Sequence, residues 1–254
     1  MIPEIQIYDY RNWKDQKVCE LGDDAIHIWK VPWKEYPYEK LAFSILSVEE
    51  RARVEKFAQM PDRHRCALGH IALRRLLGAY GGVPPCKIQM SRGKYGKLSC
   101  DTDQSMDRME FNLSHSGDWI VIALSRTFCL GVDVEEMDER KDKGKMAERF
   151  FHPAEVSAYH LAPAQERQVL FYRYWTAKEA LLKGRGDGLT RPTDSFAVAI
   201  DFNSPLEQEF DIEEDRERIL CGWHVQNFLL ESRYMASIAY RSGDSPGEWR
   251  HRQP

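Results

Sequence analysis

The sequence predicts an α+β protein made of two similar lobes. Strand-like alternations and helical periodicities follow one another along the 254 residues in two successive cycles. The last strand expected in each half carries a related pattern, Ile-Ala-Leu-Ser-Arg at 122–126 and Ile-Ala-Tyr-Arg at 238–241. The length also accommodates two units of ordinary domain size, about 100–150 residues each.

The first half is expected to run from strands through two helices and back to strands. Short apolar alternations within 1–46 predict strands at the edge of the lobe. Ser47 and Glu50 have the spacing of a capping box and predict a helix start. Gly81-Gly82 predicts the end of a second helix. The expected elements are helices at about 47–59 and 62–80, a basic loop at 92–97, a glycine-bounded turn at 112–117 and a strand at 119–124.

The second half repeats this order. Its first strand is predicted by Leu-Gly-Val-Asp-Val-Glu at 130–135. The following elements are helices at about 145–150, 153–161 and 165–185, then strands at 195–201, 222–230 and 234–240. We therefore expect an N-terminal lobe over 1–127, a C-terminal lobe over 128–241 and a polar tail over 242–254.

Composition is that of an ordinary globular protein, with 43% hydrophobic and 30% charged residues. The sequence shows neither a signal peptide nor a run of about 20 apolar residues. We therefore expect a cytoplasmic protein with no membrane partner. The six cysteines form no C-x-x-C pair and have no zinc-like spacing. We therefore expect the thiols of these cysteines to be reduced.

The net charge of −4 conceals a basic segment. Residues 51–97 contain eleven Lys or Arg against two acidic residues, a net +9, while the rest of the chain carries −13. The lack of interspersed acids favours a local polyanion site over a solvated helix face. Nucleic acid is not the expected polyanion, because the aromatic residues Phe57, Tyr80 and Tyr95 are widely spaced and no nucleic-acid-binding signature occurs.

Asp133 and Glu135 form the first candidate site. Side chains alternate along a strand, so these two carboxylates point the same way while Val132 and Val134 face the core. Two carboxylates on one face repel each other unless a cation lies between them. Hard oxygen ligands near a phosphate favour Mg²⁺. Such pairs are also common on solvent-facing strands, where they bind nothing.

Glu179 and Lys183 form the second candidate site. They lie four residues apart on the expected helix and project from the same side. Trp175 lies one turn before Glu179 and would set an aromatic wall against its carboxylate. Taken alone, the pair also fits an ordinary ion pair worth a few tenths of a kcal/mol.

Asn112, Ser114 and His115 form the third candidate site. A glycine-bounded turn offers backbone N–H groups, a hydroxyl and an imidazole to a phosphate. A serine beside a histidine also suggests a hydrolase. Adjacent residues rarely reach the geometry of nucleophile and base, and no G-x-S-x-G elbow occurs. The hydrolase interpretation is therefore disfavoured.

Three ordered motifs resemble the 4′-phosphopantetheinyl transferase superfamily, more narrowly its two-lobed, Sfp-like class. They are Phe-Asn-Leu-Ser-His-Ser-Gly at 111–117, Gly-Val-Asp-Val-Glu at 131–135 and Trp-Thr-Ala-Lys-Glu-Ala-Leu-Leu-Lys at 175–183. The resemblance covers roughly residues 45–240. It implies two lobes that form a pseudo-dimer, each a small antiparallel sheet packed with helices, with the active site in the cleft between them.

The resemblance implies a transferase of the holo-[acyl-carrier-protein] synthase type. It would move the 4′-phosphopantetheine arm of coenzyme A to a serine of an apo acyl or peptidyl carrier protein. The reaction would require Mg²⁺ and release adenosine 3′,5′-bisphosphate, and the enzyme would be a monomer. The alternatives are a Mg²⁺-dependent nucleotide phosphoesterase and a silent module that binds coenzyme A or the carrier protein.

The resemblance also implies roles for individual residues. Either Glu179 or a metal-bound water could take the serine proton. Metal binding is assigned to Asp133, Glu135 and Glu179, and catalysis to Asp133, Glu179 and Lys183, with Lys183 on the pyrophosphate. Coenzyme binding is further assigned to Asn112, Ser114 and His115 near the ribose phosphates, and to Arg53, Arg92 and Lys97 at the 3′-phosphate and adenine end. Glu50 and Cys66 depart from the family pattern, in which lysine and threonine are frequent.

A docking surface for an acidic carrier protein is expected directly after the strand at 130–135. Its basic members are Arg140, Lys141, Lys143 and Lys145, and its apolar members are Met137, Met146, Phe150 and Phe151. Asp138, Glu139 and Asp142 lie among them, so the same stretch also fits a solvated loop.

Overall fold

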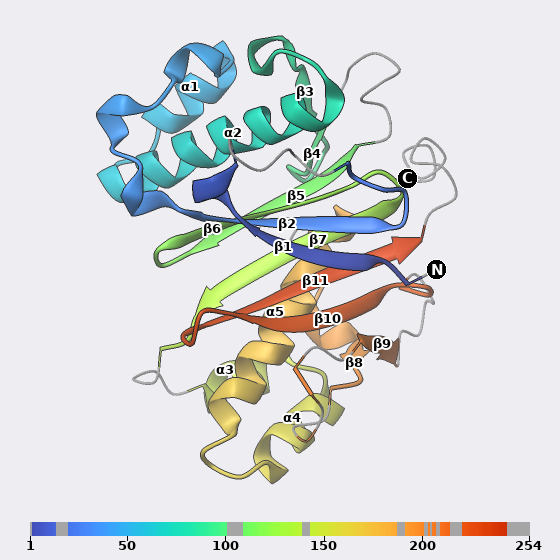
Figure 1. Cartoon of the computed structure of the whole chain (residues 1–254). Helices are drawn as coiled ribbons and strands as arrows, with labels where there is room; N and C mark the ends of the chain where they lie inside the picture. The colour runs from blue at the N-terminus through green and yellow to red at the C-terminus, as the bar shows by residue number, and fades with distance from the viewer. Residues whose placement is uncertain are drawn as a thin grey trace. The chain divides into compact units, whose positions relative to one another are not determined.

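The computed structural model describes residues 2–13, 20–100, 109–138, 143–186, 191–200, 203, 205–206, 209–213 and 220–242. They fall into two compact units (Figure 1). The described residues of unit 1 lie within Met1–Gly93 and Leu98–Thr127, and those of unit 2 within Lys94–Lys97 and Phe128–Gly243. Both units combine helices with mainly antiparallel sheets, which confirms the expected α+β class.

Unit 1 contains a four-stranded sheet in the order β1-β2-β6-β5. Its strands are β1 (Glu4–Asp9), β2 (Ala25–Pro32), β5 (Glu110–Ser116) and β6 (Trp119–Ser125). The pairs are antiparallel except for β1 and β2, which run parallel. We expected strands at the edge of this lobe; β1 is an edge strand of the sheet, whereas β2 lies inside it. The nearly continuous burial of β2 indicates that both of its faces are covered.

The helices of unit 1 lie on one face of that sheet (Figure 1). They are α1 (Val48–Glu55) and α2 (Met60–Gly81). Ser47 and Glu50 form the predicted capping box of α1, which ends earlier than expected. Gly82 ends α2 at a φ of 66°, a left-handed conformation that glycine adopts without strain. A two-stranded hairpin, β3 (Met90–Arg92) and β4 (Leu98–Cys100), completes the unit.

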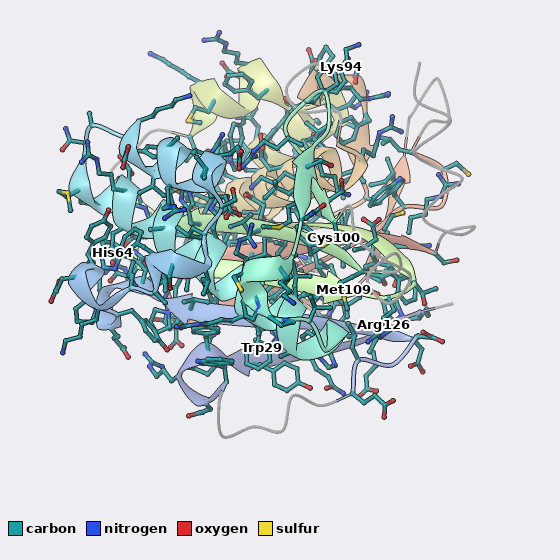
Figure 2. The ribbon with its side chains drawn as sticks, turned by 90° about the horizontal axis from the view of Figure 1, so that it is seen from above. Trp29, His64, Lys94, Cys100, Met109 and Arg126 are labelled. Carbon is teal, nitrogen blue, oxygen red and sulfur yellow. The ribbon has the colours of Figure 1, made fainter. Side chains whose placement is uncertain are left out.

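The core of unit 1 forms where α2 packs against the sheet. Leu68, Leu76 and Ile122 are fully buried in it. Three further members, Trp29, Cys100 and Met109, are labelled in the view from above in Figure 2. Among the described residues, the short 3-10 helices are Tyr10–Asn12, Trp33–Glu35, Tyr38–Lys40, Phe43–Ile45, Pro85–Lys87 and Thr193–Ser195.

Unit 2 contains a five-stranded antiparallel sheet in the order β7-β11-β10-β9-β8. Its strands are β7 (Phe128–Glu136), β8 (Ala197–Val198), β9 (Glu209–Glu213), β10 (His224–Leu230) and β11 (Tyr234–Ser242). The strand expected at 195–201 shrinks to two residues, and β9 was not expected. Pro192 and the 3-10 turn that follows it delay the start of β8.

Three helices accompany this sheet: α3 (Gly144–Phe150), α4 (Pro153–Leu161) and α5 (Arg167–Arg185). The long helix α5 packs directly on β7 and β11 (Figure 1). His152 and Glu155 form a capping box at the start of α4. No helix among the described residues has the length and apolar character needed to cross a membrane.

The two units share a topology. In unit 1 the order is strand β2, helices, then the hairpin β5–β6, and the closing strand β6 pairs with β2. In unit 2 the order is strand β7, helices, then the hairpin β10–β11, and the closing strand β11 pairs with β7. The related patterns at 122–126 and 238–241 therefore belong to equivalent strands.

Candidate functional site

Asp133 and Lys183 form an ion pair in unit 2. Asp133 lies on β7 with its side chain 5% exposed, and Lys183 lies in the last turn of α5. The Nζ of Lys183 donates to the Oδ1 of Asp133 at 2.6 Å. Lys183 remains 32% exposed, so a ligand in the solvent can reach its ammonium group. A buried carboxylate bonded to a partly exposed lysine suits a phosphate group that approaches from solvent.

Glu179 lies one helical turn before Lys183 and faces the same carboxylate. Burial raises the pKa of Glu179, and the negative charge of Asp133 raises it further, while Lys183 acts in the opposite direction. The two acids therefore resist being ionised together. Trp175, one turn before Glu179, stacks on Phe171 with ring centroids 5.9 Å apart. Its indole therefore packs against the core of unit 2.

A divalent cation fits this arrangement. Asp133 and Glu135 lie on the same face of β7, and Glu179 adds a carboxylate from α5. Within the residues that the structure describes, no group of three or more Asp, Glu, His or Cys is already closed around a common point. Mg²⁺ needs only one or two carboxylates and completes its octahedron with water and phosphate oxygens. A cation would also relieve the repulsion between Asp133 and Glu179.

Two glycines set the distance between α5 and β7. A Cβ on Gly131 would lie 2.1 Å from the carbonyl oxygen of Ala180 and 2.2 Å from the backbone nitrogen of Gly184. A Cβ on Gly184 would lie 2.7 Å from the ring of Trp223. Backbone therefore packs directly on backbone beside the site. Gly131 is two residues from Asp133 and Gly184 adjoins Lys183, so this contact places the acid opposite the lysine.

A buried ion pair that no sequence pattern indicated anchors the other face of α5. Lys178 and Glu155 have side chains 1% and 2% exposed, with Nζ 2.8 Å from Oε2. Lys178 also donates to the carbonyls of Thr193 and Phe196 at 2.7 and 2.6 Å. Glu155 accepts from the backbone N–H groups of His152 and Val198. The pair thereby joins α4, α5 and β8, and Lys178 faces away from the candidate site.

Arg53 and Arg92 form a second charged site, in unit 1. Burial lowers the pKa of Arg92, and the neighbouring charge of Arg53 lowers it further. Arg53 also lies within hydrogen-bonding reach of the Cys66 thiol. Both arginine side chains are exposed. Two guanidinium groups near enough to repel each other would gain from a bound anion, and a phosphate is one that would relieve this repulsion.

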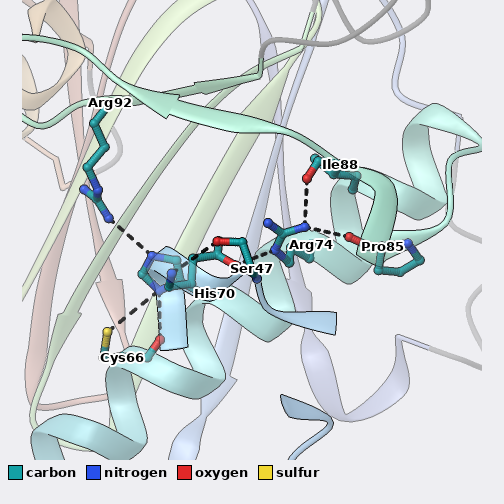
Figure 3. Close-up of polar contacts among 8 residues, drawn as sticks. Ser47, Cys66, His70, Arg74, Pro85, Ile88 and Arg92 are labelled. Atoms are coloured by element: carbon teal, nitrogen blue, oxygen red, sulfur yellow. Dashed lines mark hydrogen bonds and ion pairs between the residues drawn. The ribbon is translucent and has the colours of Figure 1, made fainter. Parts of the chain in front are cut away.

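Glu50 does not neutralise this arginine pair by a direct bond. Its Oε2 accepts from Nε of Arg74 at 2.7 Å and from the backbone N–H of Ser47 at 2.8 Å. Arg74 in turn donates to the carbonyls of Pro85 and Ile88, both at 2.8 Å (Figure 3). The acid therefore serves to pack α1 on α2.

Asn112, Ser114 and His115 lie on strand β5, not in a turn. The N–H and C=O groups of this segment take part in the ladder with β6, so they cannot all be offered to a phosphate as we expected. The turn lies further on, at Gly117, with a φ of 51°. Side chains alternate along β5. Asn112 and Ser114 therefore share one face of the strand, while His115 lies on the other face with Leu113.

Lys97 contacts backbone of unit 2. Its Nζ donates to the carbonyl oxygen of Gly184 at 2.5 Å and to that of Leu130 at 3.3 Å. Gly184 belongs to the last turn of α5, where free carbonyls favour a cation. The lysine expected at the 3′-phosphate is thus bound at the end of the helix that carries Lys183.

Part of the expected docking surface lies outside the described residues, namely Arg140, Lys141, Glu139 and Asp142. The same holds for the tail from residue 243 onwards. Lys143 is described and does not fit the prediction. It is 7% exposed, and its Nζ lies 4.7 Å from the ring centroid of Tyr172 and 5.3 Å from that of Phe171. A buried lysine over aromatic rings stabilises packing and cannot steer a partner.

Comparison with known proteins gives concordant matches. The family model for the 4′-phosphopantetheinyl transferase superfamily matches residues 129–239, and the model for the 4′-phosphopantetheinyl transferase N-terminal domain matches residues 29–127. The chain is similar to 4′-phosphopantetheinyl transferase HetI of Nostoc sp., with 35% identity over 91% of this chain and 94% of that protein. It is also similar to 4′-phosphopantetheinyl transferase Sfp of Bacillus subtilis, with 32% identity over 80% of this chain and 85% of that protein.

Proposed function

The chain belongs to the 4′-phosphopantetheinyl transferase superfamily, in its two-lobed, Sfp-like class, and we propose how its residues carry out the reaction. The enzyme transfers a phosphopantetheine arm to carrier proteins. The Sfp-like class describes it more closely than the holo-[acyl-carrier-protein] synthase type that we expected. We propose coenzyme A as the donor and adenosine 3′,5′-bisphosphate as the second product.

The observation that carries this proposal is the arrangement of Asp133, Glu179 and Lys183. In our account the pyrophosphate of coenzyme A lies against the exposed side of Lys183. Asp133 holds the ammonium in place, and Lys183 offsets the charge that develops on the phosphate oxygens as the bond to the leaving group breaks. The chain needs no nucleophile of its own, because the serine of the carrier protein attacks.

We propose that Asp133, Glu135 and Glu179 hold Mg²⁺ at this place. When bound, the ion would neutralise phosphate charge and orient the pyrophosphate. The raised pKa of Glu179 supports this assignment, since two crowded carboxylates gain from a cation. The residues of the chain itself bind the donor, fix its orientation and keep the reacting phosphate in line with the incoming serine.

We propose that Arg53 and Arg92 bind the 3′-phosphate of coenzyme A. Their mutual repulsion and their exposure support this role. Asn112, Ser114 and His115 are proposed to bind the ribose phosphates, with Asn112 and Ser114 on one face of β5 and His115 on the other. Lys97 is proposed to leave its backbone carbonyls and turn toward the donor when coenzyme A binds.

We also propose a monomer in the cytoplasm, with no nucleic acid or membrane partner. One chain supplies both of the similar lobes that the class requires. Among the described residues, Cys66, Cys86, Cys100, Cys129 and Cys221 take part in no disulfide. Several reduced cysteines in one chain are typical of a reducing compartment.

Incubation with coenzyme A tests the proposal against a phosphoesterase. The purified chain is mixed with coenzyme A and Mg²⁺, with and without an apo carrier protein, and nucleotides are separated by chromatography. We expect adenosine 3′,5′-bisphosphate only when the carrier is present, and none after chelation of Mg²⁺. Release of the same nucleotide without carrier would identify a phosphoesterase, and activity in excess chelator would contradict the metal assignment.

A further inference from the structure

His70 contacts the arginine pair of unit 1 through Arg92 and has no role in the function proposed above. It lies on α2 and is 5% exposed. Its ring is placed between two partners from different elements (Figure 3). Nδ1 lies 2.9 Å from the carbonyl oxygen of Cys66, one turn earlier on the same helix. Nε2 lies 3.4 Å from Nη2 of Arg92 on β3.

The two partners determine the form of the imidazole ring. A carbonyl oxygen only accepts, so Nδ1 must carry the proton. A guanidinium only donates, so Nε2 must offer its lone pair. The single form that satisfies both is the neutral ring with its proton on Nδ1. A charged ring would set an N–H of Nε2 against Arg92.

The surroundings favour the neutral form. Burial lowers the pKa of His70, and the charges of Arg92 and Arg53 lower it further. The Cys66 carbonyl and the Glu50 carboxylate act in the opposite direction. At neutral pH the ring therefore offers an uncharged acceptor to a positively charged group.

The neutrality of this acceptor matters for anion binding. Arg92 and Arg53 repel each other, and a bond to Nε2 offsets part of that repulsion without adding negative charge. A carboxylate in the same place would hold Arg92 more strongly but would compete with an incoming anion. Glu50, the nearby carboxylate, is already bonded to Arg74 and Ser47.

We propose that His70 is a positioning residue, whose Nε2 holds the Arg92 guanidinium beside Arg53 so that the pair is arranged for a dianionic phosphate before it binds. The inference rests on the proposed function, in which this pair takes the 3′-phosphate of coenzyme A. Prior arrangement of the two side chains reduces the entropy lost on binding. The effect should therefore appear in affinity and only for ligands that carry this phosphate.

Two variants test the role in transfer, each assayed with coenzyme A and with dephospho-coenzyme A, which lacks the 3′-phosphate. His70→Phe keeps the ring volume and removes both nitrogens. We expect it to raise the KM for coenzyme A about three- to tenfold, leaving kcat and the KM for dephospho-coenzyme A nearly unchanged. His70→Gln restores an acceptor and should bring the KM back to within about twofold of wild type. An equal rise for both substrates, or no rise, would overturn the proposal.

A binding experiment separates this inference from the proposed function. Adenosine 3′,5′-bisphosphate and adenosine 5′-monophosphate are titrated calorimetrically into wild type, His70→Phe and His70→Gln, without carrier protein. Weaker binding of the bisphosphate alone to His70→Phe supports the inference even if no transfer is observed. Equal affinities across the three proteins would reject it even if transfer is confirmed.

The tautomer gives a test that needs neither activity nor ligand. Long-range ¹H–¹⁵N correlation spectra distinguish a proton on Nδ1 from one on Nε2, and His70 is assigned by its absence from the His70→Gln spectrum. We expect the neutral Nδ1–H form at pH 7. A proton on Nε2, or a charged ring, would contradict the bond to Arg92. Because His70→Gln serves as the reference, the test stands even if His70→Phe does not fold.

Discussion

The ammonium of Lys183 lies 2.6 Å from the Oδ1 of Asp133, a residue 50 positions earlier in the chain. This bond ties the last turn of α5 to the middle of β7. It leaves Lys183 one third exposed and Asp133 buried. The acid therefore orients the lysine, whose ammonium group is partly open to the surface.

Removal of this ammonium should reduce transfer. Lys183→Ala is expected to lower kcat at least about 100-fold, because the charge developing on the phosphate loses its fixed partner. Lys183→Arg should recover part of the loss, since it keeps the charge but changes the geometry. Steady-state assays with an apo carrier measure both. Lys40→Ala is the control and should behave as wild type, because Lys40 is an exposed lysine at the end of the 3-10 helix Tyr38–Lys40. Full activity of Lys183→Ala would remove this residue from the reaction.

Gly131 should tolerate no side chain. An added Cβ would meet backbone atoms of α5 at 2.1 and 2.2 Å, so Gly131→Ala must push the helix away from β7. We expect a loss in the free energy of unfolding of about 3 kcal/mol or more. Gly69→Ala on α2 is the matched control, because the nearest atom there is the mobile Leu113 Cδ1 at 3.2 Å. Urea unfolding compares them, and equal stabilities would show that α5 and β7 are not in backbone contact.

The buried pair of Lys178 and Glu155 should behave as a unit. Lys178→Met leaves Glu155 buried without its cation, and we expect a loss of about 3–5 kcal/mol. Adding Glu155→Gln should recover part of this, because the amide carries no charge and its oxygen can still accept from one of the two backbone N–H groups. Chemical denaturation of the two single variants and the double variant gives the coupling energy. Strictly additive losses would argue against a direct interaction.

His27 should make unit 1 sensitive to acid. Trp29 Nε1 donates to the hydroxyl of Tyr80 at 3.0 Å, which leaves that hydroxyl to donate to Nδ1 of His27 at 2.7 Å. Burial lowers the pKa of His27 from 6.5 to about 4, while Glu4 opposes the shift. Between these values the unfolded state binds more protons than the folded state. Stability should therefore rise with pH across this window and fall, by up to about 3 kcal/mol, as the pH drops from 6.5 to 4.

Unfolding by urea at pH 7, 6 and 5 measures this dependence. His27→Gln removes the titrating ring and should unfold with a shallower dependence on pH than wild type, even if it is less stable at pH 7. An unchanged dependence would show that His27 is not held neutral by the fold.

Local patterns in the sequence predicted most of the elements, but not the contacts between distant segments. As expected, the capping box at Ser47 begins α1 and Gly82 ends α2. Asp133 on the strand and Lys183 on the helix were each predicted as site residues. The hydrogen bond between them was not predicted, because it depends on the backbone contact of Gly131 with Gly184. No periodicity in the sequence reports such a contact.

Other differences have the same origin. The serine and histidine motif at 112–117 looked like a turn, because its polar residues and glycine suit one. Pairing with β6 makes it a strand instead. His70 had no visible signal beyond its position four residues after Cys66, and its partner Arg92 lies 22 residues away. Lys143 was taken as exposed from its charge, whereas the rings of Phe171 and Tyr172 cover it.

Transfer of phosphopantetheine to a carrier protein should depend on the carboxylates of unit 2. Mass spectrometry of an apo carrier measures this dependence, after incubation with coenzyme A, Mg²⁺ and wild type, Asp133→Ala, Glu179→Ala or Glu136→Ala. Glu136 lies on the opposite face of β7, paired with Arg233 at 2.7 Å, and serves as the control. We predict that wild type and Glu136→Ala add one phosphopantetheine arm to the carrier and that Asp133→Ala and Glu179→Ala leave it nearly unmodified. Complete modification by both Asp133→Ala and Glu179→Ala, with all four proteins folded, would contradict the account.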